Sequence, residues 1–110
     1  MKNISISNND LIRLTINNDD SKVIEFDPTD FKFVKGLQDL RELFQKANAD
    51  NITEIFEKSD VIINKLFGAK ATEYLFNNKW NITAYREFIT QIVPFVKNKR
   101  DEIIAQYTNK

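Results

Sequence analysis

Cysteine and histidine are both missing from this chain of 110 residues, and glycine and proline occur only twice each. Without cysteine there is neither a disulfide framework nor a thiolate site, and without histidine the commonest metal ligand and the usual neutral-pH base are lost. Two glycines also leave no glycine-rich phosphate loop or nucleophile elbow. We therefore expect no metal, no other cofactor and no enzymatic activity.

Net charge is the next thing the chain lacks, because Lys plus Arg and Asp plus Glu number 16 each. No net field then steers the protein toward phosphate backbones or anionic lipid. No apolar run approaches the roughly 20 residues of a membrane span, and polar residues interrupt the N-terminal region where a signal peptide needs an apolar core. We expect a soluble intracellular protein with neither nucleic acid nor membrane as a partner.

Apolar and aromatic residues, in contrast, are plentiful. Hydrophobic residues make up 42% of the chain and aromatic residues 12%, with nine phenylalanines. A chain of this length fits one domain with a real core. We expect a single domain over 1–110, in which residues 1–26 form a β-hairpin region and residues 27–107 a helical region.

The first 26 residues alternate between apolar and polar side chains, as in a strand with one buried face. The alternating apolar positions are Ile4, Ile6, Ile12, Leu14 and Ile16. Asn- and Asp-rich stretches at 8–10 and 17–20 predict turns, because these side chains mimic turn hydrogen bonds. Two to three short antiparallel strands follow, and they must rest on helices or on another subunit to be stable.

The apolar spacing changes to that of a helix after Asp27 and Pro28. Asp27 is the expected N-cap, Pro28 suits the first helical position, and Asp30 adds negative charge where the helix dipole favours it. Gly36 lies inside this helix and indicates close approach of a neighbour. A second helix, capped by Asp50 or Asn51, follows after so short a break that the two are expected to be antiparallel neighbours.

Gly68 is expected to end the second helix as a left-handed cap, before a short helix near 72–76. Asn81 is placed to cap a long last helix. Pro94 removes a backbone hydrogen bond in that helix, so a kink or a break is expected near 91–94. The fold class is thus α+β, mainly α, with an N-terminal hairpin of two to three strands packed on a bundle of three to four helices.

For the acidic and basic clusters we favour structural roles over catalytic or phosphate-binding ones. Asp19 and Asp20 fit an exposed turn rather than a catalytic acid pair, which needs a buried and shared environment. The run 97–102 (KNKRDE) fits a solvated, ion-paired helix face rather than a phosphate site, since its acids cancel its bases.

Aromatic residues around Gly68 leave two alternatives open. The clusters 66–68 and 74–76 either form a tight helical corner of the core or leave part of their surface exposed for a protein partner. Trp80 is either a capping or interface aromatic or a platform for a ligand. The last helix is too long for the domain to cover, so its end is expected to project toward a partner. The candidate partner-binding residues are Phe67, Tyr74, Phe76, Trp80, Ile103 and Tyr107.

Three segments resemble the tail assembly chaperones of long-tailed, siphovirus-type bacteriophages of Gram-positive bacteria. They are 26–37 (FDPTDFKFVKGL), 63–76 (INKLFGAKATEYLF) and 81–96 (NITAYREFITQIVPFV). The positions that match the family pattern are Asp27, Asp30, Phe67, Gly68, Thr72 and Phe76. Asn77 stands where a family variant has a second glycine, and Gly36 has no counterpart in the pattern.

This resemblance implies a non-enzymatic chaperone that binds the phage tape measure protein and keeps it soluble during tail assembly. It places the protein in the host bacterial cytoplasm and outside the mature virion. A homo-oligomer stays open as a further partner. The alternative is a structural tail or head–tail connector component that is retained in the virion.

Overall fold

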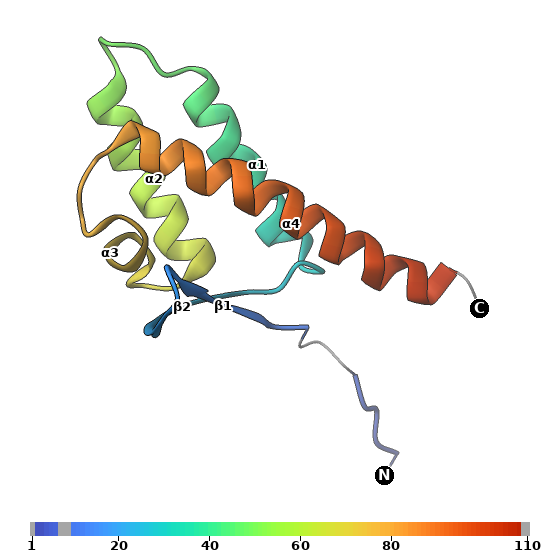
Figure 1. The fold of residues 1–110 in the computed structure, drawn as a ribbon. Helices are drawn as coiled ribbons and strands as arrows, with labels where there is room; N and C mark the ends of the chain where they lie inside the picture. The colour runs from blue at the N-terminus through green and yellow to red at the C-terminus, as the bar shows by residue number, and fades with distance from the viewer. Residues whose placement is uncertain (1, 7–9, 109–110) are drawn as a thin grey trace.

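An antiparallel hairpin and four helices make up this computed structural model, which describes residues 2–6 and 10–108 and, of Tyr107, the backbone alone. The elements are β1 (Ile12–Ile16), β2 (Asp19–Phe26), α1 (Phe31–Gln45), α2 (Ile52–Phe67), α3 (Ala71–Phe76) and α4 (Ile82–Thr108). The predicted fold class, α+β and mainly α, is confirmed. In Figure 1 the neighbours α1 and α2 run in opposite directions, α4 passes beside them, and the hairpin lies across their lower end.

The hairpin turns at Asn17 and Asn18, whose φ angles are 52° and 59°. Two successive residues with positive φ are what a tight two-residue hairpin turn requires, and asparagine tolerates them well. Ile12 faces Phe26 and Leu14 faces Ile24 across the antiparallel pair. The apolar face of the hairpin is buried at β2, which supplies two core residues. Within the described part of the chain the sheet has two strands, the lower of the two numbers expected.

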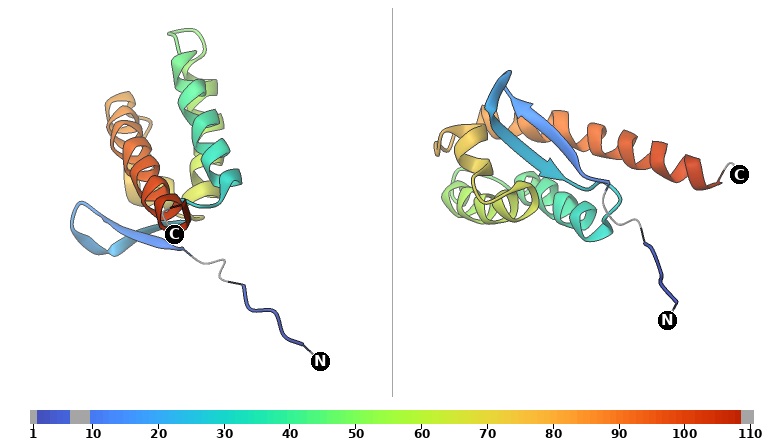
Figure 2. Two further views of the ribbon diagram at one scale, coloured as in Figure 1. Left: turned by 90° about the vertical axis from the view of Figure 1, so that its right-hand side faces the viewer. Right: turned by 90° about the horizontal axis from the view of Figure 1, so that it is seen from below.

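The residues before the hairpin form no strand where they are described. Ile4 and Ile6 are 81% and 74% exposed. Figures 1 and 2 show this N-terminal arm extending away from the body of the protein. The predicted turn at 8–10 lies outside the described residues except for Asp10, which belongs to no helix or strand.

Asp30, and not Asp27, caps α1. The Asp30 carboxylate accepts a hydrogen bond from the Lys32 amide at 2.9 Å. Asp27 instead accepts from the backbone amide and the hydroxyl of Thr29, at 2.8 and 2.6 Å. This local turn competes with helix formation, so the helix starts after the second aspartate. The predicted cap at Asp27 is therefore wrong by three positions, and Pro28 lies in the turn rather than in the helix.

Gly36 of α1 lies directly against the Leu66 side chain of α2. A Cβ atom at Gly36 would lie 2.6 Å from Leu66 Cδ2, so the absence of a side chain gives the leucine its place. This confirms the predicted close approach of a neighbour. The antiparallel order of α1 and α2 is visible in Figure 1.

Gly68 ends α2 with φ 124° and ψ 152°. The positive φ was expected, but the ψ value is extended rather than left-handed helical, a combination that is essentially restricted to glycine. The short helix α3 follows directly. It ends at Asn77, which adopts the left-handed conformation and donates its amide to the Glu73 carbonyl at 2.9 Å.

The last helix is capped as predicted, since Asn81 Oδ1 accepts from the Thr83 and Ala84 amides at 2.9 and 3.3 Å. The helix then continues through Pro94 as one element, so of the kink or break expected there the break does not occur. Pro94 and Thr90, whose carbonyl loses its usual partner, are both exposed. Water can therefore hydrate that carbonyl, which lowers the cost of the proline.

One cluster of buried side chains joins β2 to all four helices. Phe26 of β2 stacks on Phe33 of α1 at 5.3 Å, and Phe67 of α2 meets both rings edge-on at 5.6 and 5.4 Å. Phe88 of α4 reaches the same group through Phe67 at 5.2 Å. Aromatic pairs in these geometries stabilise beyond their buried area. Phe26 and Ile24, which is buried in the same cluster, thus hold the hairpin to the helices.

Replacing Gly68 by alanine should lower the free energy of unfolding by about 1–3 kcal/mol, because the backbone there favours glycine alone. No atom lies within 4 Å of the added Cβ, so the loss comes from the backbone. Urea denaturation measures it. Gly36→Ala is the control: its Cβ displaces the flexible tip of Leu66, but the gain in helix propensity of about 1 kcal/mol offsets this. Equal losses in both variants would contradict the backbone explanation.

Candidate functional site

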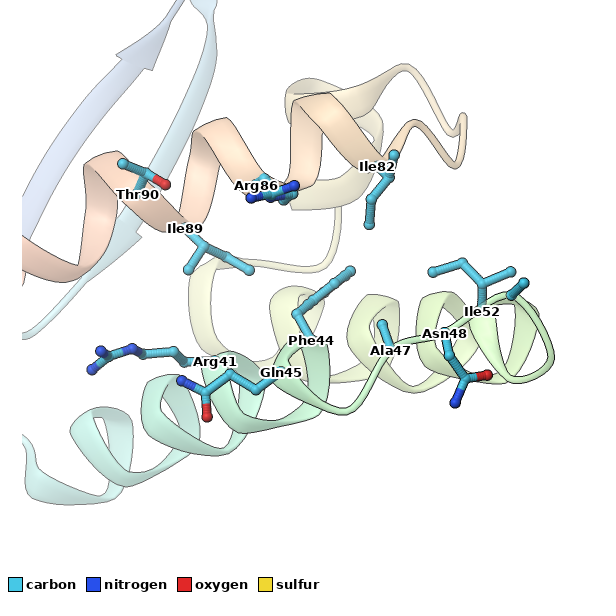
Figure 3. Close-up of a pocket in the computed structure, with 11 residues that line it drawn as sticks. Arg41, Phe44, Gln45, Ala47, Asn48, Ile52, Ile82, Arg86, Ile89 and Thr90 are labelled. Carbon is cyan, nitrogen blue, oxygen red and sulfur yellow. The ribbon is translucent and has the colours of Figure 1, made fainter.

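A groove lies between the C-terminal half of α1 and the N-terminal half of α4 (Figure 3). Its volume is about 710 Å³. The lining residues are Arg41, Phe44, Gln45, Ala47, Asn48, Ala49, Ile52, Ile82, Arg86, Ile89 and Thr90. Each of them is half-buried or exposed, so the space is an open groove and not an enclosed cavity.

The floor of the groove is apolar. Phe44 from α1 and Ile89 from α4 face each other across it in Figure 3, while Ile52 and Ile82 lie toward its far end. Phe44 is anchored from behind by the Phe56 ring at 6.0 Å and the Tyr85 ring at 5.8 Å. Core packing therefore holds the Phe44 part of this floor in place.

A second, smaller hollow of about 190 Å³ continues between the same two helices. Its lining residues are Val34, Leu37, Gln38, Arg41, Val93, Val96, Lys97 and Arg100. Arg41 lines both hollows, which therefore lie next to each other. We call the two together the α1/α4 groove.

One face of α4, from Ile82 to Arg100, lines the α1/α4 groove. The residues on this face are Ile82, Arg86, Ile89, Val93, Lys97 and Arg100, at spacings of four or three. Such spacing keeps side chains on one side of a helix. The core face lies next to it and carries Tyr85, Ile92 and Val96, which are 1%, 4% and 2% exposed. Figure 2 (left) shows α4 on one side and α1 with α2 on the other, above the hairpin.

The groove is lined by positive charge alone. Its ionisable lining residues are Arg41, Arg86, Lys97 and Arg100, and none of its lining residues is Asp or Glu. Lys97 and Arg100 both face Asp101, at 3.0 and 3.8 Å. Polar Gln38, Gln45, Asn48 and Thr90 complete the rim. An apolar floor between cationic walls suits a partner that has both an apolar and an anionic surface.

The six residues predicted to bind a partner do not come together. Phe67 and Phe76 are core residues, 2% and 6% exposed, and leave almost no surface for a partner in this structure. Tyr74 is half-buried and Trp80 is 47% exposed, both at the α2–α3 corner or just after it. The last two, Ile103 and Tyr107, lie far along α4.

Ile103 is half-buried in a small hollow at the other end of the molecule, together with Phe31 and Ile104. Tyr107 belongs to α4, and its side chain lies outside the described part of the structure. Figure 1 shows the end of α4 extending past the other helices, as its length predicted. Phe31 and Ile104 are 66% and 43% exposed there.

Trp80 is held rather than free. Its ring stacks on Phe56 at 5.6 Å and 4°, and its Nε1 donates to Asp60 Oδ2 at 2.8 Å. The other oxygen of Asp60 accepts from the Tyr85 hydroxyl at 2.6 Å. Asp60 therefore joins an exposed tryptophan to a buried tyrosine. This arrangement favours the capping explanation of Trp80 over a ligand platform.

The carboxylate pairs have structural partners as well. Asp19 accepts from the amide and the hydroxyl of Ser21, and these hydrogen bonds lower the pKa of Asp19. Asp101 pairs with Lys97, and Glu102 with Lys99 at 3.6 Å. Among the described residues no three His, Cys, Asp or Glu side chains gather as metal ligands. No helix in the described ranges is both long and apolar enough to cross a membrane.

Sequence reasoning did not identify the groove. Arg41, Ile82, Arg86 and Ile89 are not among the six residues predicted to bind a partner. A signal was present in the second stripe of α4, where basic and apolar residues share one face beside the core face. Whether α1 covers that face of α4 depends on how the two helices pack, which the residue pattern of α4 does not show.

Comparisons with protein-family models, with curated proteins and with solved structures found no match to this chain. The interpretation of the groove therefore rests on its own geometry and on the resemblance carried by the three segments described above.

Replacing Tyr85 by phenylalanine should lower the free energy of unfolding at neutral pH by about 1–2 kcal/mol, since the part-buried hydrogen bond from the Tyr85 hydroxyl to Asp60 is lost. The substitution should also change how the free energy of unfolding falls as the pH becomes alkaline. Burial first, then the hydrogen bond and the charge of Asp60, raise the pKa of Tyr85 well above its ordinary value. A raised folded-state pKa gives stability that is present below the unfolded pKa of about 10 and is lost above it.

The wild-type protein should therefore lose stability more steeply than Tyr85→Phe between about pH 9.5 and 11. Urea denaturation at several pH values measures both slopes. Trp80→Phe is the matched control, because it removes the other hydrogen bond to Asp60 and keeps the tyrosine. Parallel slopes for wild type and Tyr85→Phe would show that the Tyr85 hydroxyl is not coupled to folding.

Proposed function

We propose that this protein is a non-enzymatic tail assembly chaperone of a long-tailed bacteriophage. It binds the tape measure protein in the host cytoplasm, keeps it soluble while the tail is assembled, and is absent from the mature virion. The resemblance of segments 26–37, 63–76 and 81–96 to that family suggests the role. The α1/α4 groove is the observation that carries the proposal.

The groove suits a helical client. Helix-in-groove recognition places the apolar face of an amphipathic helix into an apolar groove between helices. Here Phe44, Ile52, Ile82 and Ile89 supply the floor, and the groove follows α4 from Ile82 to Arg100. A long client whose helices expose apolar stripes would otherwise aggregate through those stripes.

Release is as necessary as binding, because tail tube subunits must later displace a chaperone of this kind. The groove is shallow, since each residue that lines its larger hollow keeps some contact with solvent. Its rim is polar and charged, so the edges of a bound helix would stay hydrated. Contacts of this sort exchange more readily than a deeply buried apolar interface.

The alternative function is a structural tail or head–tail connector component that stays in the particle. Mass spectrometry of purified virions separates the two, since a retained component appears in stoichiometric amount and an assembly chaperone does not. Finding this chain as a stoichiometric virion component would replace the proposed function by the alternative.

Co-expression with the cognate tape measure protein tests the proposal directly. The wild-type chain should raise the soluble fraction of the client, measured by centrifugation and gel densitometry. Ile82→Asp should reduce that effect, because an isoleucine contact worth roughly 1.5–3 kcal/mol is about tenfold or more in affinity. Ile82 is 41% exposed and begins α4, where aspartate is tolerated.

Val61→Asp is the matched control. Val61 is 70% exposed on α2 and lies outside the groove, so this variant should keep the client as soluble as the wild type does. A client that is equally insoluble with and without the wild-type chain would overturn the proposed function. Equal losses from both variants would remove the groove as its site.

A further inference from the structure

The four arginines of the chain divide into two kinds. Arg13 pairs with Glu25 at 2.6 Å, and Arg100 faces Asp101 at 3.8 Å. Arg41 and Arg86, in contrast, have no carboxylate partner within 4.0 Å among the described residues. Both of them line the α1/α4 groove. The two arginines without an acid partner therefore both line the larger hollow of the α1/α4 groove.

Positive charge is thus concentrated in the α1/α4 groove, although the chain as a whole has no net charge. Acidic and basic residues are equal in number over the sequence, yet the groove is lined by cations and by none of the 16 acids. A positive surface of this kind attracts and orients an acidic partner. Arginine is well suited to the task, because its guanidinium binds carboxylates through two parallel hydrogen bonds.

Position matters as much as charge. Arg41 lies on the α1 wall and Arg86 on the α4 wall, with Phe44 and Ile89 between them (Figure 3). An occupant therefore needs an apolar surface in the middle and acidic groups on both sides of it. The stretch of α4 that lines the groove, Ile82 to Arg100, is about 27 Å long at 1.5 Å per residue. That length accommodates a helix of about five turns.

We infer that the α1/α4 groove takes an amphipathic helix of a protein partner that carries Asp or Glu on both flanks of its apolar stripe, with Arg41 and Arg86 as the residues that select it. The inference rests on the proposed function for the identity of the partner, and it adds the chemistry of the segment that is bound. The apolar floor favours a protein helix over nucleic acid, whose phosphate backbone would leave that floor uncovered.

Two synthetic helical peptides of about 18 residues test the inference with the full-length protein. Both carry the same leucine stripe; one has Glu on both flanks and the other has Lys at the same positions. Isothermal titration calorimetry should show the Glu peptide binding about tenfold more tightly at low salt. The difference should shrink as the salt concentration rises from about 0.05 to about 0.5 M, because salt screens exposed charges.

Charge reversal identifies the residues responsible. The double variant Arg41→Glu/Arg86→Glu should reverse the preference, so that the Lys peptide binds more tightly than the Glu peptide. Lys2→Glu/Lys70→Glu is the control, because it changes the net charge equally at two exposed sites outside the groove. The control should keep the wild-type preference. Circular dichroism of each variant verifies that the helices are intact.

Four results would overturn the inference. The first three are equal affinity for both peptides, a preference that survives the double reversal, and binding of a single-stranded oligonucleotide that depends on the same two arginines more strongly than peptide binding does. The fourth is a preference lost equally in the lysine control, which would assign the preference to net charge. Client solubility in the co-expression assay is a separate readout, so the inference can fail while the proposed function stands, and the reverse.

Discussion

Tyr85 is the residue on which the arrangement of the helices depends. Its ring stacks on Phe76 of α3 at 3.8 Å, meets Phe56 of α2 edge-on at 4.9 Å and lies 5.8 Å from Phe44 of α1. Its hydroxyl donates to Asp60 of α2, so the polar end of a 1% exposed side chain is satisfied. One α4 side chain thus contacts all three other helices, and a buried aromatic with a satisfied hydroxyl is strongly stabilising.

The groove is a consequence of this attachment. Tyr85 and its neighbours on the core face hold the first half of α4, and the adjacent face turns toward α1 without being covered by it. Phe44 belongs to both features, because its ring packs on Tyr85 and also forms part of the groove floor. The same contacts that stabilise the fold therefore fix the shape of the candidate binding surface. Cationic residues are tolerated there because solvent reaches them.

Local features of the chain were largely predictable from residue pattern. The asparagine pair of the hairpin turn, the cap at Asn81 and the close approach at Gly36 are all found where the sequence placed them. The wrongly predicted helix start arose where two nearby residues could fill the same structural role. Asp27 and Asp30 are both able to cap a helix, and the turn formed by Asp27 with Thr29 decided between them. At Pro94, where a kink or a break was expected, α4 is not broken, because this face of the helix is solvated.

Residue types and their spacing thus sufficed for the element order, the hairpin turn and the amphipathic stripes, because those depend on neighbours a few positions apart. Packing alone decided which apolar face stays open. Arg41 and Arg86 are 45 positions apart in the numbering of the chain, and their presence on opposite walls of one groove follows from the angle at which α4 crosses α1. That angle is set by long-range contacts of Tyr85 and the core, which no local pattern encodes.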